Sequence, residues 1–286
     1  DNPDDTSLEN VMKQSINLIA QLPTMMIYSY QSLRHTYQHK SLYFHYPKSG
    51  LSTAEHILDI YRPDQNYTHE EARLLDLCMV LHADHGGGNN STFADRVLSS
   101  TGTDTYSAIS AAIGSLKGPK HGGANLKVME LLDEMMANLK DTEDREEVRE
   151  YLRKVIRKQA GDGTGLLYGI GHAVYTKSDP RAQILKKQTR NIAYEKGFRK
   201  EFDLICLIEE LAPGVFAEEK GQTKNVCANV DLFSGLVYRV LGIDENLFTP
   251  LFAISRITGW CAHRMEEVEF GNRLIRPAYR YIESVK

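Results

Sequence analysis

Residues 68–82, THEEARLLDLCMVLH, form the segment that best indicates the fold class. Thr68 lies three positions before Glu71, which is the spacing of a capping box at the start of an α-helix. Apolar residues then recur every three or four positions, as they do on the buried face of a helix. The segment therefore predicts a helix that packs with one side against a core.

Helix start and stop signals recur along the rest of the chain. The Asp-Pro pair at 179–180 combines a capping residue with a proline that suits the first helical position, and Gly197 is placed to end that helix. The Thr-Pro pair at 249–250 predicts another helix start, and Gly242 predicts another helix end. These signals extend the helical prediction to both halves of the chain.

Three further segments bear on the fold class. Residues 143–159 are amphipathic and highly charged, which predicts a solvated surface helix. Residues 103–118 are rich in Ala, Ser and Gly, which predicts a helix that a neighbour can approach closely. Alternating strand patterns are scarce, and SLYFHY at 41–46 is the best short candidate. We predict an all-α, multi-helical protein.

Composition excludes several classes of partner. The chain has 286 residues, 42% of them hydrophobic and 25% charged, which is typical of a globular protein with a real core. Its formal charge of −4 and the lack of a basic stripe argue against nucleic acid as a partner. No run of about 18 apolar residues predicts a membrane span. The cysteines form no CxxC pair, so we expect free thiols and a cytoplasmic protein; they are Cys78, Cys206, Cys227 and Cys261.

Four segments place a histidine or an aspartate beside glycine. Glycine lets the backbone approach a ligand closely and adopt positive φ angles. One such segment would mean little, but four in a helical protein suggest loops that converge on a pocket. The segments are HADHGGGNNST (82–92), GPKHGGAN (118–125), GIGHAVYTKSDPR (169–181) and NVDLFSG (229–235).

A metal site and a phosphate loop are the two alternatives for the first segment. A metal site on His82, Asp84 and His85 needs further ligands in coordination geometry, and neither an HExxH spacing nor a nearby cysteine cluster supplies them. A phosphate loop needs a preceding strand and a following Lys-Ser or Lys-Thr pair. This segment follows a predicted helix, and no such lysine comes after its glycines. We therefore expect no metal here. For any one of these histidines taken alone, a structural role is the commoner outcome.

Several arginines point to an anionic small molecule. Arg181 follows the Asp-Pro pair, Arg256 lies among apolar residues on a predicted buried helix, and Arg273 and Arg276 lie near the C-terminus. Guanidinium groups bind carboxylates in a bidentate way, so buried arginines favour a carboxylate ligand. The alternative for each is a surface ion pair.

These segments, in this order, resemble the motifs of the citrate synthase family. GPKHGGAN resembles GPxHGGAN, GIGHAVYTKSDPR resembles GxGHxVxxxxDPR, NVDLFSG resembles NVDFYSG, and the opening segment resembles HADHxxNxST. The resemblance extends from about residue 70 to the end and is looser before that point, so we expect the family's N-terminal part to be missing. It implies two domains: a large helical domain of residues 1–121 and 236–286, and a small lid domain of residues 122–235.

The resemblance also implies an activity and a catalytic set. The family condenses acetyl-CoA with oxaloacetate and water to give citrate and CoA. By position, Asp231 is the general base that removes a proton from the acetyl methyl group. His121 stabilises the enol or enolate that forms, and His172 polarises the ketone of oxaloacetate.

Substrate contacts follow from the same resemblance. Oxaloacetate would be held by His85, Arg181 and Arg256, with Arg276 reaching across from the second subunit of a homodimer, so that the active site is shared. Acetyl-CoA is a co-substrate, and no tightly bound cofactor is expected. CoA contacts are implied for Lys117, Gly118, Gly169, Gly171, Ala173 and Lys177. Thr176 stands where some members have arginine, and Gly86 where the family often has glutamate or another residue, so the resemblance supports the CoA contacts less directly than the catalytic trio.

Two alternative functions stay open at this point. A 2-methylcitrate synthase would use propionyl-CoA with the same catalytic trio, and accepting one more methyl group involves only about 1–3 kcal/mol. A protein of another class, an inactive fragment or non-catalytic paralogue that acts in an interaction, would not need His121, His172 and Asp231 intact. A metal hydrolase based on residues 82–85 is a distant third alternative.

Overall fold

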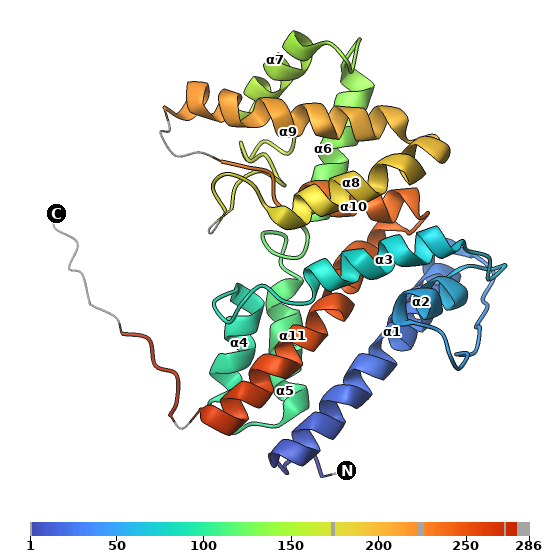
Figure 1. Ribbon diagram of the computed structural model, residues 1–286, viewed down its shortest axis with the longest axis vertical. Helices are drawn as coiled ribbons and strands as arrows, with labels where there is room; N and C mark the ends of the chain where they lie inside the picture. Colours follow the sequence, from blue (N-terminus) through green and yellow to red (C-terminus); the bar gives the residue numbers. More distant parts are fainter. Residues whose placement is uncertain (1, 173–174, 222–225, 272, 279–286) are drawn as a thin grey trace. The chain divides into compact units, whose positions relative to one another are not determined.

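The computed structural model describes residues 2–172, 175–221, 226–271 and 273–278 (Figure 1). Within these residues the secondary structure is helical, and β pairing is limited to one isolated antiparallel bridge between Ile170 and Ala228. The predicted all-α fold is confirmed. The α-helices are α1 (Leu8–Gln38), α2 (Thr53–Tyr61), α3 (His69–His82), α4 (Asn90–Ser99), α5 (Thr105–Leu116), α6 (Ala124–Asn138), α7 (Arg145–Ile156), α8 (Pro180–Glu195), α9 (Arg199–Lys220), α10 (Asp231–Val240) and α11 (Phe248–Phe270), and a short 3₁₀ helix, η1 (Glu245–Leu247), precedes α11.

The predicted helix boundaries are set by the capping groups that the sequence indicated. At the start of α3 the Thr68 N–H donates to Glu71 Oε2 at 2.8 Å, and the Glu71 N–H donates to Thr68 Oγ1 at 3.2 Å. Asp179 caps α8, and Gly197 follows that helix with a φ of +86°. Gly242 follows α10 with a φ of +69°. These local predictions are confirmed.

The chain divides into two compact units. Unit 1 comprises residues 1–21, 83–116 and 256–286, and unit 2 comprises residues 22–82 and 117–255. Helices α1 and α11 each contribute residues to both units. These units are groups of residues in mutual contact, and the division into a large domain and a lid domain stays a prediction.

Helix α10 lies at the centre of unit 2, where it packs against α3, α6, α8 and α9. From Leu232 to Val240 its side chains are buried apart from the half-buried Arg239. Close packing depends on Gly235, because a Cβ there would lie 2.8 Å from the carbonyl oxygen of Asn125 in α6. The sequence NVDLFSG therefore folds into the start of the most buried helix of this unit.

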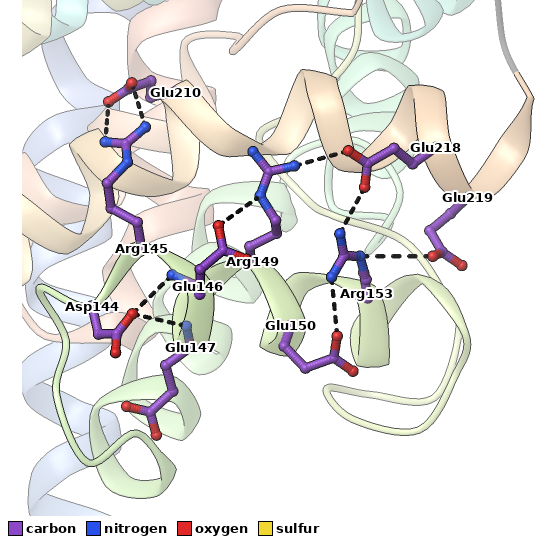
Figure 2. Close-up of polar contacts among 10 residues, drawn as sticks. All are labelled: Asp144, Arg145, Glu146, Glu147, Arg149, Glu150, Arg153, Glu210, Glu218 and Glu219. Carbon is purple, nitrogen blue, oxygen red and sulfur yellow. Dashed lines mark hydrogen bonds and ion pairs between the residues drawn. The ribbon is translucent and has the colours of Figure 1, made fainter.

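Helix α7 is joined to α9 by a row of ion pairs (Figure 2). Arg145 donates to both carboxylate oxygens of Glu210, at 3.0 and 2.6 Å. Arg149 and Arg153 each donate to Glu218, at 2.9 Å in both cases. The predicted surface helix is thus amphipathic as expected, but its arginines, which recur every four residues, contact glutamates of α9 instead of lying in solvent alone.

Several polar and charged side chains are buried in unit 1. Arg264 of α11 is fully buried and donates to Thr105 Oγ1 at 3.0 Å, to Ser99 Oγ at 3.0 Å and to the Thr103 carbonyl at 2.8 Å. Asp95 of α4 is also fully buried, and neither of its carboxylate oxygens has a hydrogen-bond partner among the described residues. Around these groups, the small residues of α5 allow close packing against α4, as the composition of 103–118 predicted.

The strand candidate at 41–46 is wrong. Residues 39–48 have no regular secondary structure and lie against helices of unit 2. The Tyr28 hydroxyl donates to the His45 carbonyl at 2.8 Å, and the rings of Tyr28 and Phe44 meet edge to face with centroids 4.8 Å apart. The aromatic residues that suggested a strand therefore pack on α1. In the described part of the chain no helix is long and apolar enough to cross a membrane.

Candidate functional site

Two of the glycine-containing segments pair with each other in unit 2. The Gly171 N–H donates to the Cys227 carbonyl at 2.8 Å, and the Asn229 N–H donates to the Gly169 carbonyl at 2.8 Å. Gly169 has a φ of +76°, and a Cβ there would lie 2.9 Å from the Cα of Leu232. Only glycine fits this close approach without strain. The pairing brings the loop that carries His172 beside the start of α10.

Asp231 is the first residue of α10, and its position is fixed by Asn229. The Asp231 N–H donates to Asn229 Oδ1 at 3.0 Å, and Asn229 Nδ2 donates to the Gly171 carbonyl at 2.9 Å. A carboxylate in the first turn of a helix is favoured by the helix dipole. Asp231 is half-buried.

The ring of His172 has a defined tautomer. The Tyr175 N–H donates to His172 Nδ1 at 2.9 Å, so Nδ1 is an acceptor and the proton of a neutral ring lies on Nε2. Burial, followed by the positive charge of Arg181, lowers the pKa of His172 below its usual 6.5, although Asp179 acts in the opposite direction. Near neutral pH the ring is therefore uncharged and presents an Nε2–H donor.

Arg181 lies next to this donor. Its Nη2 is 3.4 Å from His172 Nε2, so the guanidinium group and the ring face the same region. Asp179 fixes the guanidinium group in a bidentate manner, with Nε–Oδ1 at 3.0 Å and Nη2–Oδ2 at 2.8 Å. Paired donors of this kind suit a carbonyl or carboxylate oxygen of a ligand.

Sequence reasoning missed this role of Asp179. The residue was expected only to cap α8, which it does by accepting from the Arg181 N–H at 2.9 Å. It is also fully buried and forms the ion pair with Arg181. The Asp-Pro-Arg triplet was the available signal, because it places a carboxylate two residues before the arginine.

His121 lies in a third segment that contacts α10 through α6. Its backbone N–H donates to the Gly118 carbonyl at 2.9 Å, which closes the turn before α6. The half-buried ring meets Phe252 edge to face, with centroids 6.0 Å apart. Thr249 Oγ1 donates to the Gly122 carbonyl at 3.1 Å and so ties this turn to the start of α11. The segments that carry His121, His172 and Asp231 therefore all belong to unit 2 and pack around α10.

Two predicted oxaloacetate residues lie in unit 1. Arg256 is only 1% exposed, and its Nη1 donates to Asn89 Oδ1 at 3.1 Å. Asn89 precedes α4 and ends the loop in which the half-buried His85 lies. The same loop contacts α11 through Asp84, whose Oδ1 is 3.2 Å from His263 Nε2. The predicted burial of Arg256 is confirmed, and its role in binding oxaloacetate stays a prediction.

His82 differs from its neighbours in this segment. It is fully buried, its Nδ1 lies 2.8 Å from the Cys78 carbonyl, and its ring packs against Phe252 at a centroid distance of 4.6 Å. This is the environment of a structural histidine. Among the residues that the structure describes, no three His, Cys, Asp or Glu side chains are grouped so that they could hold a metal ion.

The remaining predicted residues lie at the surface or in the paired loops. Arg276 is exposed in the irregular segment 274–278, and Lys117 and Lys177 are exposed as well. Gly118 accepts the hydrogen bond of the turn before α6, and Gly169 and Gly171 form the pairing described above. Ala173 lies outside the described residues. CoA binding by this group and the action of Arg276 in a second subunit stay predictions.

Comparison with known proteins identifies the family of this chain. Residues 1–278 match the family model described as citrate synthase, C-terminal domain. The chain belongs to the citrate synthase family. It is 39% identical over 235 residues to a citrate synthase of Deinococcus radiodurans, a match that covers 82% of this chain and 57% of the relative. It is 41% identical over 211 residues to citrate synthase 2 of Bacillus subtilis, covering 74% and 51% of the two chains.

Solved citrate synthases share the fold. The structure from Thermotoga maritima aligns with a TM-score of 0.77 and 31% identity over 97% of this chain and 69% of that one. A ternary complex of the Thermoplasma acidophilum citrate synthase with carboxymethyl coenzyme A and oxaloacetate aligns with a TM-score of 0.79 and 30% identity, over 97% and 68%. The chain spans about half the length of the curated relatives it matches.

Proposed function

We propose that the protein condenses acetyl-CoA with oxaloacetate and water to give citrate and free CoA. The reaction forms one carbon–carbon bond between the acetyl methyl carbon and the ketone carbon of oxaloacetate. Water then hydrolyses the thioester of the citryl-CoA intermediate, which releases the thiol of CoA. Acetyl-CoA is a co-substrate, and the proposed chemistry uses no metal and no bound prosthetic group.

Each member of the proposed trio has a distinct task. The Asp231 carboxylate takes a proton from the acetyl methyl group. An N–H of His121 donates to the thioester oxygen and stabilises the negative charge that develops there. The Nε2–H of His172 donates to the ketone oxygen of oxaloacetate, which becomes an alkoxide when the new bond forms. Two neutral imidazoles and one carboxylate thus divide the acid and base work.

One observation carries this proposal most directly. The pairing of 169–171 with 227–229 holds the His172 loop beside the helix that begins with Asp231. The tautomer of His172 supplies a donor for the ketone, and Arg181 supplies a second donor beside it. A ketone flanked by a carboxylate, as in oxaloacetate, has acceptors for both.

Binding of the dianionic substrate is proposed to require residues from both subunits of a homodimer. His85, Arg181 and Arg256 would hold oxaloacetate, and Arg276 would reach it from the second subunit of a homodimer. Residues 122–235 would act as a lid over residues 1–121 and 236–286, so that closure excludes water before the thioester reacts. The free thiols of all four cysteines support a reducing, cytoplasmic location.

The test is an assay of the purified protein with oxaloacetate and either acetyl-CoA or propionyl-CoA. We expect oxaloacetate-dependent release of CoA and formation of citrate, identified by mass, because thiol reagents alone also react with the protein's own cysteines. Faster turnover of propionyl-CoA with formation of 2-methylcitrate would move the assignment to the 2-methylcitrate synthase. A folded protein that turns over neither thioester would refute the proposal.

A matched pair of variants tests the general base. Asp231→Asn should lower kcat by about 10³-fold or more with little change in oxaloacetate binding, because only the proton acceptor is lost. Asp133→Asn, which changes a half-exposed carboxylate of α6 that pairs with Arg239, is the control and should retain its activity. Near-normal turnover in the Asp231 variant would remove the general-base assignment.

A further inference from the structure

The side chain of Asn229 makes two hydrogen bonds that connect the two paired loops. Its Oδ1 accepts from the Asp231 N–H at 3.0 Å, and its Nδ2 donates to the Gly171 carbonyl at 2.9 Å. One amide group therefore contacts the first residue of α10 and the residue that immediately precedes His172.

We propose that Asn229 is a positioning residue that holds Asp231 and His172 in a fixed relation for the condensation proposed above. Its two bonds act on the backbone at Asp231 and at Gly171, so the side chain itself needs no contact with substrate. Loss of either bond would let the start of α10 or the His172 loop shift.

The backbone pairing does not replace this side chain. The bonds from Gly171 to Cys227 and from Asn229 to Gly169 align the two loops along their length. They do not reach the N–H of Asp231, which lies in the first turn of α10 and has no carbonyl four residues earlier in the helix to accept it. The side-chain Oδ1 of Asn229 accepts the hydrogen bond from that N–H and thereby sets the direction in which α10 leaves the loop.

Both ends of an amide are needed at this position. Aspartate would keep the acceptor for Asp231 but would place a carboxylate oxygen against the carbonyl oxygen of Gly171. Alanine would remove both bonds. A protonated aspartic acid would again have an O–H to donate to Gly171, so Asn229→Asp should behave as a pH-dependent version of the native residue.

The expected results follow from these three side chains. Asn229→Ala should lower kcat by roughly 10- to 100-fold, because displacements of about 1 Å at a reacting group have effects of this size. The KM for oxaloacetate should change by less than about threefold, because Arg181 is held separately by Asp179. Relative to wild type, Asn229→Asp should lose activity at pH 8 and regain part of it as the pH falls towards 5.

A control and a second readout separate this inference from the proposed function. Asn138→Ala removes another side-chain bond to a backbone carbonyl, that of Glu134, at the end of α6, and should leave kcat and its pH profile unchanged. The titration of histidine ring signals by NMR does not require an active enzyme. In Asn229→Ala, the ring signal of His172 should shift relative to wild type by more than the ring signal of His45 does.

The outcomes distinguish the two ideas. Wild-type protein without oxaloacetate-dependent turnover would refute the proposed function, and the NMR titration would still decide whether Asn229 positions His172. An active wild type with an Asn229→Ala variant within twofold in kcat, and with an unmoved His172 signal, would overturn the positioning role. The positioning role would also be overturned if the loss of kcat in Asn229→Ala matched its loss of folded protein and Asn229→Asp regained no activity as the pH fell.

Discussion

Replacing Asp95 with asparagine should stabilise unit 1, and by more as the pH rises. Asp95 is fully buried on α4, and its carboxylate has no hydrogen-bond partner among the described residues. Burial raises its pKa from 3.8 to about 7, while the charges of Arg264, His263 and Arg96 act to lower it and Glu267 acts to raise it further.

The sign of the effect follows from the direction of the pKa change. The folded protein binds this proton more tightly than the unfolded chain does, so ionisation of Asp95 favours unfolding. Its contribution to stability is fully present below about pH 4, falls as the pH rises, and is lost above about pH 7. At about 1.4 kcal/mol for each tenfold change in proton affinity, the rise from 3.8 to about 7 corresponds to at most about 4 kcal/mol.

Asparagine resembles the protonated form of Asp95 in shape and charge. The three hydrogen bonds of Arg264 go to Ser99, Thr103 and Thr105, so the substitution removes none of them. The free energy of unfolding of Asp95→Asn should therefore exceed that of wild type, by about 1–2 kcal/mol at pH 5 and by up to about 4 kcal/mol at pH 8.

Trp260 provides the measurement. It is the single tryptophan of the chain, is fully buried in unit 1, and donates from Nε1 to Ser91 Oγ at 3.2 Å. Its fluorescence during urea unfolding at pH 5, 6, 7 and 8 reports on this unit. Asp76→Asn, which changes an exposed carboxylate of α3, is the control. The same pH dependence in wild type and in Asp95→Asn, or a less stable variant at pH 8, would refute this account of the buried carboxyl group.

Two further predictions concern the candidate site. Gly169→Ala should destabilise unit 2 by about 1–3 kcal/mol and lower the melting temperature, because Gly169 has a φ of +76° and an added Cβ would lie 2.9 Å from Leu232 Cα; an unchanged melting temperature would contradict it. Arg276→Ala should raise the KM for oxaloacetate if Arg276 acts across a dimer. Mixed dimers of Arg276→Ala and Asp231→Asn chains would then contain one intact site and recover activity, whereas no recovery would exclude a shared site.

Local signals in the sequence were sufficient for the helix ends that they marked. The capping box at Thr68 and Glu71 and the glycines after α8 and α10 depend on groups within a few residues, so the chain itself specifies them. The aromatic segment at 41–46 failed because its side chains are fixed by α1, which is distant in sequence. Aromatic and β-branched residues favour strands largely because of how their side chains pack against neighbours, so their preference depends on context.

The buried polar groups of unit 1 could not be predicted in the same way. Hydrophobic periodicity assigns charged residues of a helix to its exposed face, yet Asp95 and Arg264 are both fully buried. Arg264 is tolerated because its donors reach a hydroxyl from each of two helix termini and one carbonyl. Such partners meet only after α4, α5 and α11 have packed.

Asp179 and Asn229 show which contacts of the candidate site can be predicted from the sequence. Each lies two residues before the residue that it holds, and each accepts a backbone hydrogen bond from it, which is a local pattern that sequence can predict. The second contact differs. Asp179 binds the side chain of the same Arg181, whereas Asn229 binds Gly171, which is 58 residues away. Replacing Asp179 should therefore disturb one guanidinium group, but replacing Asn229 should disturb the relation between two loops, and only the fold reveals that difference.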